Sequence, residues 1–97
     1  MRILVVEDDA RIARDVERAL TANGYLVDRA SDGEDALFRG EHETFDGAIL
    51  DLGLPGLDGM TILKRWRSAG IRLPVVVLTA RGRWMERVEG IDAGADD

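Results

Sequence analysis

The sequence predicts an α/β domain, a doubly wound and mainly parallel sheet with helices on both faces. Short apolar runs rich in β-branched residues alternate four times with segments whose apolar residues recur at helical spacing. This alternation requires crossover connections between parallel strands, which are right-handed and place helices on both faces of one sheet. The 97 residues have the length of one domain, so we expect no second catalytic or DNA-binding module within them.

The first strand and the first helix follow from the amino-terminal pattern. Residues 3–6 form an apolar run that is typical of a buried strand. From Ala10 onward, apolar residues recur at three- and four-residue intervals and predict one face of a helix. Asn23 and Gly24 tolerate a left-handed backbone and therefore predict the end of this helix.

The middle of the chain predicts an edge strand, a short helix and a third strand. Residues 25–30 alternate in polarity, which favours a half-exposed strand at the edge of the sheet. Ser31 and Glu34 have the spacing of a capping box and predict the start of a short helix. Residues 45–50 predict a third strand, and Asp51 follows it directly.

The remaining segments predict a loop, a helix, a fourth strand and a final helix. Two glycines and a proline in residues 52–57 predict a loop, and Asp58 is a suitable N-cap for a helix that turns Trp66 inward. Residues 74–78 are all apolar, as in a strand covered on both faces. A last helix is expected within residues 83–94.

The charge balance favours small cations over polyanions as binding partners. Thirteen basic and nineteen acidic residues give a net charge of −6, the wrong sign for binding nucleic acid or an anionic membrane. The chain has no cysteine, which excludes disulfides and thiolate metal sites and suits a reducing compartment. No segment is long and apolar enough for a signal-peptide core or a membrane span, so we expect a cytoplasmic protein.

Acidic and hydroxyl side chains follow three of the predicted strands. Glu7 and Asp8 come after the first strand, Asp51 after the third and Thr79 after the fourth. The carboxyl ends of parallel strands meet at one edge of the sheet, where functional groups gather. If the first and third strands are neighbours, Glu7, Asp8 and Asp51 converge at this edge. Carboxylates this close together raise one another's pKa, and a hard divalent cation such as Mg²⁺ relieves their repulsion. The pattern therefore predicts a magnesium site with a phosphate-facing side, to which Thr79 offers a hydroxyl donor.

These motifs resemble the receiver domain of two-component response regulators. The resemblance runs from the first residue to the last, and its carboxyl-terminal part is similar to the OmpR/PhoB-like branch of winged-helix transcription factors. It implies a flavodoxin-like sheet with strand order 2-1-3-4. The segments that carry it are the acidic turn at residues 5–9, the phosphoacceptor segment at 51–59, the switch strand at 78–80, and the stretches 80–82, 87–88 and 90–97.

The resemblance also implies a role for each residue of the acidic site. Asp51 would be the nucleophile that accepts a phosphoryl group and forms an acyl phosphate. Asp8 and Asp51 would bind Mg²⁺ through their side chains, Glu7 through water and Gly53 through its backbone carbonyl. Thr79 would follow the phosphoryl group and transmit the change in charge.

The implied function is a signalling module and not a turnover enzyme. A sensor histidine kinase or a small phosphodonor would supply the phosphoryl group, and the output would be transcription. One alternative is an aspartate-nucleophile phosphatase, but those enzymes resemble a pattern with a second aspartate where this chain has Gly53. Another alternative is an interaction or dimerisation module that is impaired in phosphorylation.

Residues 1–97 resemble a receiver domain that is incomplete at its carboxyl end. The family's fifth strand and fifth helix are absent, together with a lysine that contacts the phosphoryl group. The apolar strand at 74–78 would then be an uncovered edge strand, so we expect self-association as a dimer or a domain-swapped oligomer. Arg87 and Asp92 resemble the subfamily's ion-pairing interface residues, and either Trp84 or its neighbour Met85 is expected at a partner surface.

Overall fold

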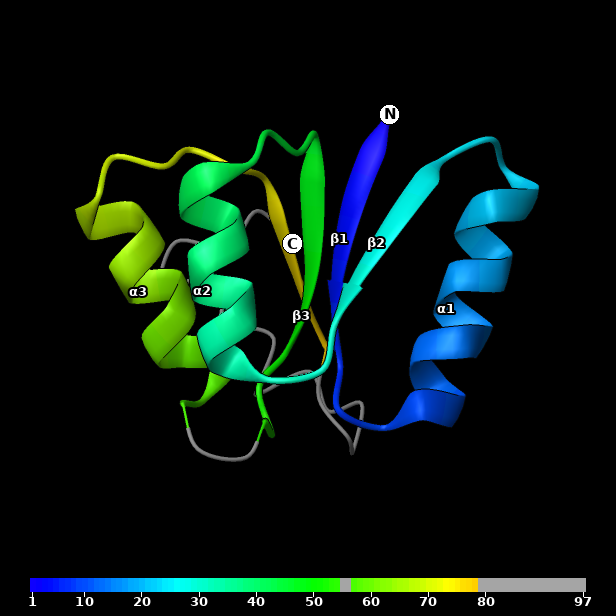
Figure 1. Cartoon of the computed structure of the whole chain (residues 1–97), viewed down its shortest axis with the longest axis horizontal. Helices are drawn as coiled ribbons and strands as arrows, with labels where there is room; N and C mark the ends of the chain where they lie inside the picture. The colour runs from blue at the N-terminus through cyan, green and yellow to red at the C-terminus, as the bar shows by residue number, and fades with distance from the viewer. Residues whose placement is uncertain (55–56, 79–97) are drawn as a thin grey trace.

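A computed structural model of the chain describes residues 1–54 and 57–78 (Figure 1). Strands and helices alternate along the chain as the sequence predicts. The predicted last helix, within residues 83–94, lies outside the described residues. In chain order, the elements are β1 (Arg2–Val6), α1 (Ala10–Ala22), β2 (Leu26–Ala30), α2 (Gly33–His42), β3 (Gly47–Asp51), α3 (Gly59–Ser68) and β4 (Val75–Leu78).

The described strands form one parallel sheet in the order β2-β1-β3-β4. The register aligns Val6 with Leu50 between β1 and β3, and Asp51 with Leu78 between β3 and β4. Figure 1 shows α1 on one face of this sheet and both α2 and α3 on the other. The predicted fold class and strand order are confirmed. None of the described helices is long and apolar enough to cross a membrane.

The main core lies between the sheet and the α2–α3 pair. Alternate strand residues point toward these helices, and most of them are fully buried. Trp66 on α3 is completely buried, as its helical spacing predicts. The strand and helix residues that carry this core are Leu4, Val6, Ala48, Leu50, Ile62, Leu63, Val75 and Val77.

A glycine on α2 allows the two helices of this layer to approach closely. A Cβ atom at Gly40 would overlap the indole ring of Trp66. A larger side chain would therefore push α2 away from α3, and interiors this well packed tolerate added volume poorly. Gly40 and Trp66 together set the spacing between the helices.

Capping residues fix the starts of the three described helices. Asp9 caps α1 by accepting hydrogen bonds from two backbone N–H groups, and Asp58 caps α3 by accepting one from Thr61. The predicted cap at Ser31 is wrong by one residue. Asp32 has the extended backbone of an N-cap, and its side chain accepts a hydrogen bond from the Asp35 N–H at 2.8 Å.

Each of the four described strands begins one or two residues away from its predicted start, with β1 beginning at Arg2 and β4 at Val75. The second strand begins at Leu26, one residue later than predicted. The third begins at Gly47 and not at Phe45, because the preceding residues contact the side chain and backbone of Arg2. The Asp46 carboxylate accepts a hydrogen bond from the Arg2 N–H at 2.7 Å, and the Arg2 guanidinium lies 4.6 Å from the centre of the Phe45 ring.

The outermost described strand on one side of the sheet is β4. Its residues Val75 and Val77 are fully buried under the helices, whereas Val76 and Leu78 on the opposite face remain 39% and 38% exposed. The sequence predicted an apolar strand with an uncovered face here. The strand itself is confirmed, and its uncovered face stays a prediction because residues 79–97 lie outside the described part of the chain.

Candidate functional site

The sheet brings three carboxylates together at the carboxyl ends of its two central strands. Glu7 and Asp8 follow β1, and Asp51 is the last residue of β3. Because β1 and β3 are parallel neighbours that run in register, the residues beyond their last pair emerge side by side. One oxygen from each carboxylate lies within 4.8 Å of the others. The predicted convergence of these residues is confirmed.

Backbone hydrogen bonds to the outer strands hold both acidic ends in place. The Glu7 N–H donates to the carbonyl of Ala30 in β2 at 3.1 Å. The Leu52 N–H, directly after Asp51, donates to the carbonyl of Leu78 in β4 at 3.0 Å. Each acidic turn is therefore tied to the strand outside it, which limits how far the carboxylates can move apart.

Asp51 is the most enclosed of the three acids. It is 4% exposed and is the one buried charged residue in the described part of the chain. Glu7 is half-buried and Asp8 is exposed. The Gly53 N–H donates a hydrogen bond to Asp51 Oδ1 at 3.0 Å, which orients a carboxylate that is otherwise cut off from solvent.

The close packing of acids changes the titration of Glu7. Partial burial, reinforced by the charges of Asp51 and Asp8 and by a hydrogen bond with Asp51, raises the pKa of Glu7 to about 7. A hydrogen bond from the Asp9 N–H to Glu7 Oε1, at 3.1 Å, opposes this rise because it stabilises the ionised form. Near neutral pH, Glu7 is therefore divided between its protonated and ionised forms.

Two backbone features of this site were not predicted from the sequence. The first is the hydrogen bond from the Gly53 N–H to Asp51. The second is the close approach of the start of α3 to the Asp51 backbone, where a Cβ atom at Gly59 would overlap the Asp51 carbonyl. The sequence signal for this close approach is the glycine directly after the N-cap Asp58, because most other residues favour a helix better than glycine does. Gly59 lets the start of α3 support the strand end that carries Asp51.

The three carboxylates suit a hard divalent cation. None of the ion pairs found among the described residues involves Glu7, Asp8 or Asp51, so their charges are not neutralised there. Magnesium is bound by one or two carboxylates together with water and phosphate oxygens. The donor set and its spacing fit that requirement. The other predicted site and interface residues, Thr79, Trp84, Arg87 and Asp92, lie outside the described residues.

Known proteins match the whole chain. A family model described as the response regulator receiver domain matches residues 3–97. The two-component response regulator PhoP of Pseudomonas aeruginosa is 44% identical over 97 residues, which are all of this chain and 43% of that protein. The response regulator MprA of Mycobacterium avium is 47% identical over the same length, which is 42% of that protein. The chain thus spans less than half the length of these relatives.

Solved receiver structures share the fold. The receiver domain of the Francisella response regulator 1452 has a TM-score of 0.91 at 34% identity, covering 99% of this chain and 79% of that one. The response regulator TrrA of Thermotoga maritima, solved in complex with Mg²⁺ and BeF, has a TM-score of 0.87 at 32% identity. That match covers 98% of this chain and 81% of TrrA.

The geometry predicts an unusual titration for Glu7 that depends on Asp51. In an NMR titration of the side-chain carboxyl carbons, Glu7 should titrate near pH 7 and not near its ordinary value of 4.5. The Asp51→Asn variant removes a neighbouring negative charge, so the pKa of Glu7 should fall but stay above 4.5, because burial persists. Asp15→Asn, an exposed position on α1, is the matched control and should leave Glu7 unchanged. Titration of wild-type Glu7 near 4.5 would contradict the described packing.

Proposed function

Since the chain belongs to the response regulator receiver domain family, we propose that it accepts a phosphoryl group on Asp51 from a sensor histidine kinase. The observation that carries this proposal is the convergence of Glu7 and Asp8 on a buried, hydrogen-bonded aspartate. The module acts as a signalling switch whose two states differ in the charge at Asp51.

In the proposed reaction, Asp51 is the nucleophile. A carboxylate oxygen of Asp51 forms a bond to phosphorus while the bond between phosphorus and the donor histidine nitrogen breaks, and the imidazole then takes up a proton. The Gly53 N–H holds the carboxylate in one orientation, and the hydrogen bond from Leu52 to β4 fixes the strand end behind it. Phosphoryl transfer depends mainly on such positioning and on neutralising charge.

The acidic site also supplies the residues that would hold Mg²⁺. Asp8 and Asp51 would bind through their carboxylates, Glu7 through water and Gly53 through its carbonyl oxygen. When bound, the cation neutralises charge that gathers on the phosphoryl oxygens.

The output of the switch is proposed from the relatives. Salmonella typhimurium has a virulence transcriptional regulatory protein PhoP that is 45% identical over the whole of this chain. We therefore propose regulation of transcription as the output, with Thr79 transmitting the phosphorylation state. Arg87, Asp92 and Trp84 would lie at the partner surface of the switch.

We also propose that a second copy of the chain pairs through β4. The exposed parts of Val76 and Leu78 form an apolar strip on a strand that is outermost among those described. An outer strand with an exposed apolar strip favours association with another strand. Exchange of elements between copies is one way to cover both the edge and the strip.

The phosphoacceptor role predicts modification of a single residue. Incubation with acetyl phosphate and Mg²⁺ should add the mass of one phosphoryl group to the intact chain, and beryllium fluoride should bind in competition with it. Asp51→Asn should abolish the mass gain, whereas Asp46→Asn, an exposed acid outside the site, should retain it. An equal mass gain in wild type and Asp51→Asn would contradict the assignment of Asp51.

Pairing through β4 predicts an association that one substitution weakens. Sedimentation equilibrium of the wild type should show a mass that rises with concentration. Val76→Lys places a charge on the apolar strip and should shift the protein toward monomer. Leu26→Lys is the matched control on the other outer strand, where the side chain is 69% exposed, and should not change the mass. A wild-type chain that stays monomeric at its highest attainable concentration would contradict the proposal.

A further inference from the structure

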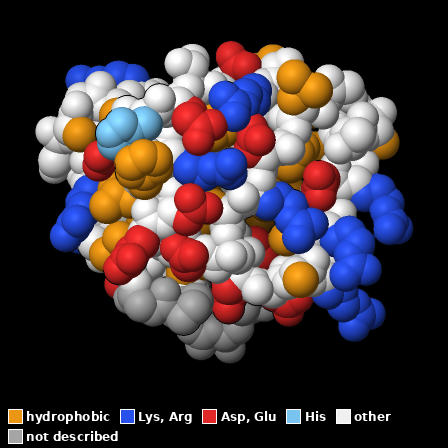
Figure 2. Space-filling model, in the orientation of Figure 1, with side chains coloured by type: hydrophobic (Ala, Val, Ile, Leu, Met, Phe, Trp, Pro, Cys, Tyr) orange, Lys and Arg blue, Asp and Glu red, His pale blue; other side chains and the backbone are white. Residues whose placement is uncertain are grey.

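An open groove of about 420 Å³ lies between α2 and α3, and it shares no lining residue with the acidic site. Figure 2 shows apolar side chains on this part of the surface next to the single histidine, with acidic side chains close by. The groove has an apolar floor and wall and charged residues at its borders. It is lined by Glu34, Leu37, Phe38 and Glu41 of α2, by Leu57 before α3, and by Arg65 of α3.

Phe38 is an exposed aromatic side chain that stacks on a neighbouring ring. It is 59% exposed, although its neighbour Leu37 packs against the core, as does Leu57 across the groove. The His42 ring stacks on Phe38 with 4.2 Å between ring centroids and 19° between planes. His42 Nδ1 also lies 2.9 Å from the Phe38 carbonyl oxygen. Phe38 is thus an exposed apolar contact point whose ring is stacked on one side by His42.

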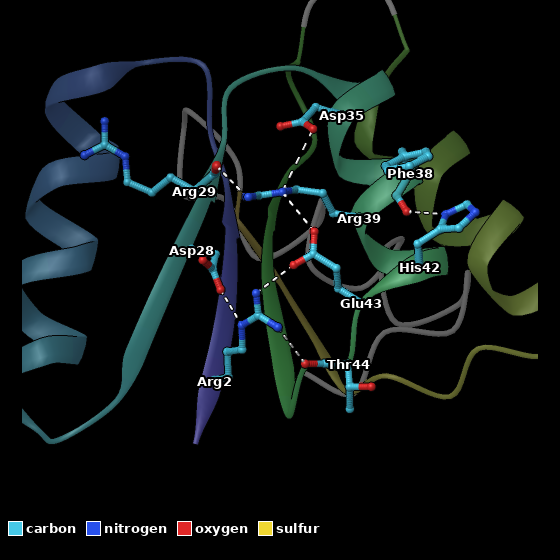
Figure 3. A network of polar contacts seen from close by, with 9 residues as sticks. All are labelled: Arg2, Asp28, Arg29, Asp35, Phe38, Arg39, His42, Glu43 and Thr44. Atoms are coloured by element: carbon cyan, nitrogen blue, oxygen red, sulfur yellow. Dashed lines mark hydrogen bonds and ion pairs between the residues drawn. The ribbon is translucent and has the colours of Figure 1, made fainter.

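The charged residues of α2 divide into two groups on opposite sides of the helix. On the side toward β2, Arg39 pairs with Asp35 and Glu43, and its guanidinium also donates to the Arg29 carbonyl (Figure 3). Glu43 pairs in turn with Arg2. Figure 3 places Phe38 and His42 away from this network.

On the groove side, the acids lack such partners. Neither Glu34 nor Glu41 forms an ion pair with another described residue, and the same holds for Arg65 on the facing helix. Glu34 and Glu41 are two helical turns apart, about 10.5 Å along the axis, with Phe38 between them. Glu34 and Glu41 thus flank an exposed aromatic side chain and have no ion-pair partner among the described residues. A molecule with cationic groups at the same spacing would be complementary to them.

We propose that this groove binds an amphipathic helix of a partner protein, with cationic side chains two turns apart and large apolar side chains between them. The cations would pair with Glu34 and Glu41, and the apolar side chains would cover Phe38 and the floor formed by Leu37 and Leu57. An acidic side chain on the partner's outer flank would meet Arg65. Helix-in-groove recognition uses this spacing of anchors, and the acidic borders disfavour a nucleic acid or an anionic membrane.

A synthetic helical peptide tests the proposal on the whole chain. The probe is an alanine-based helix with two lysines seven positions apart and two leucines between them. Titration followed by backbone NMR should shift resonances of α2, Leu57 and α3 selectively. Phe38→Ser should weaken binding roughly tenfold, as expected for removal of a central aromatic anchor. The double variant Glu34→Gln/Glu41→Gln should weaken it by a similar factor at low salt.

The controls separate recognition from general attraction between charges. A peptide with glutamates in place of the lysines should bind at least roughly tenfold more weakly. The matched variant Asp15→Asn, which removes an exposed acid on α1, should leave the affinity unchanged. Phosphorylation of Asp51 in Phe38→Ser should equal that of wild type, which shows that the variant is folded. Absence of shifts at the groove, or equal affinity for wild type and Phe38→Ser, would overturn the proposal.

Discussion

The confinement of three carboxylates within 4.8 Å of one another is the constraint on which the site depends. Like charges at this distance repel, and the pKa of Glu7 is raised to about 7 first by partial burial and then by this repulsion. The acids do not relax apart because they follow or end neighbouring parallel strands, which are paired in register from Ile3 with Gly47 to Val6 with Leu50. The fold thus concentrates negative charge at the carboxyl ends of β1 and β3, and a cation can neutralise this charge.

The packing of α2 and α3 against the sheet supports the strand ends that carry these acids. On one face, Trp66 and the strand residues beneath it form a core that α2 can approach only because Gly40 has no side chain. Gly59 lets α3 begin against the backbone of Asp51, and Asp58 caps that helix. Buried apolar packing therefore offsets the electrostatic repulsion at the rim, since hydrophobic burial is the dominant favourable contribution to folding.

Most of the fold could be predicted from the sequence, because apolar periodicity determines which face of each element is buried. The convergence of Glu7 and Asp51 followed from the strand order that the family resemblance implied and from the rule that parallel strands end at one edge. Features that depend on the path of the backbone could not be predicted. Asp32 replaced Ser31 as a helix cap, and the Gly53 N–H contact with Asp51 requires a loop shape that residue spacing does not specify.

On the described surface, the acidic site and the groove proposed to bind a partner are formed by different residues. The acidic site lies at the carboxyl ends of the strands, whereas the α2–α3 groove around Phe38 carries acids that pair with nothing else described. Isothermal titration calorimetry with MgCl₂ measures directly whether the three carboxylates bind a cation. One Mg²⁺ should bind per chain, Asp8→Asn and Asp51→Asn should each abolish binding, and Asp46→Asn should retain it. Unchanged Mg²⁺ binding in Asp8→Asn and Asp51→Asn would show that the three carboxylates do not form the site.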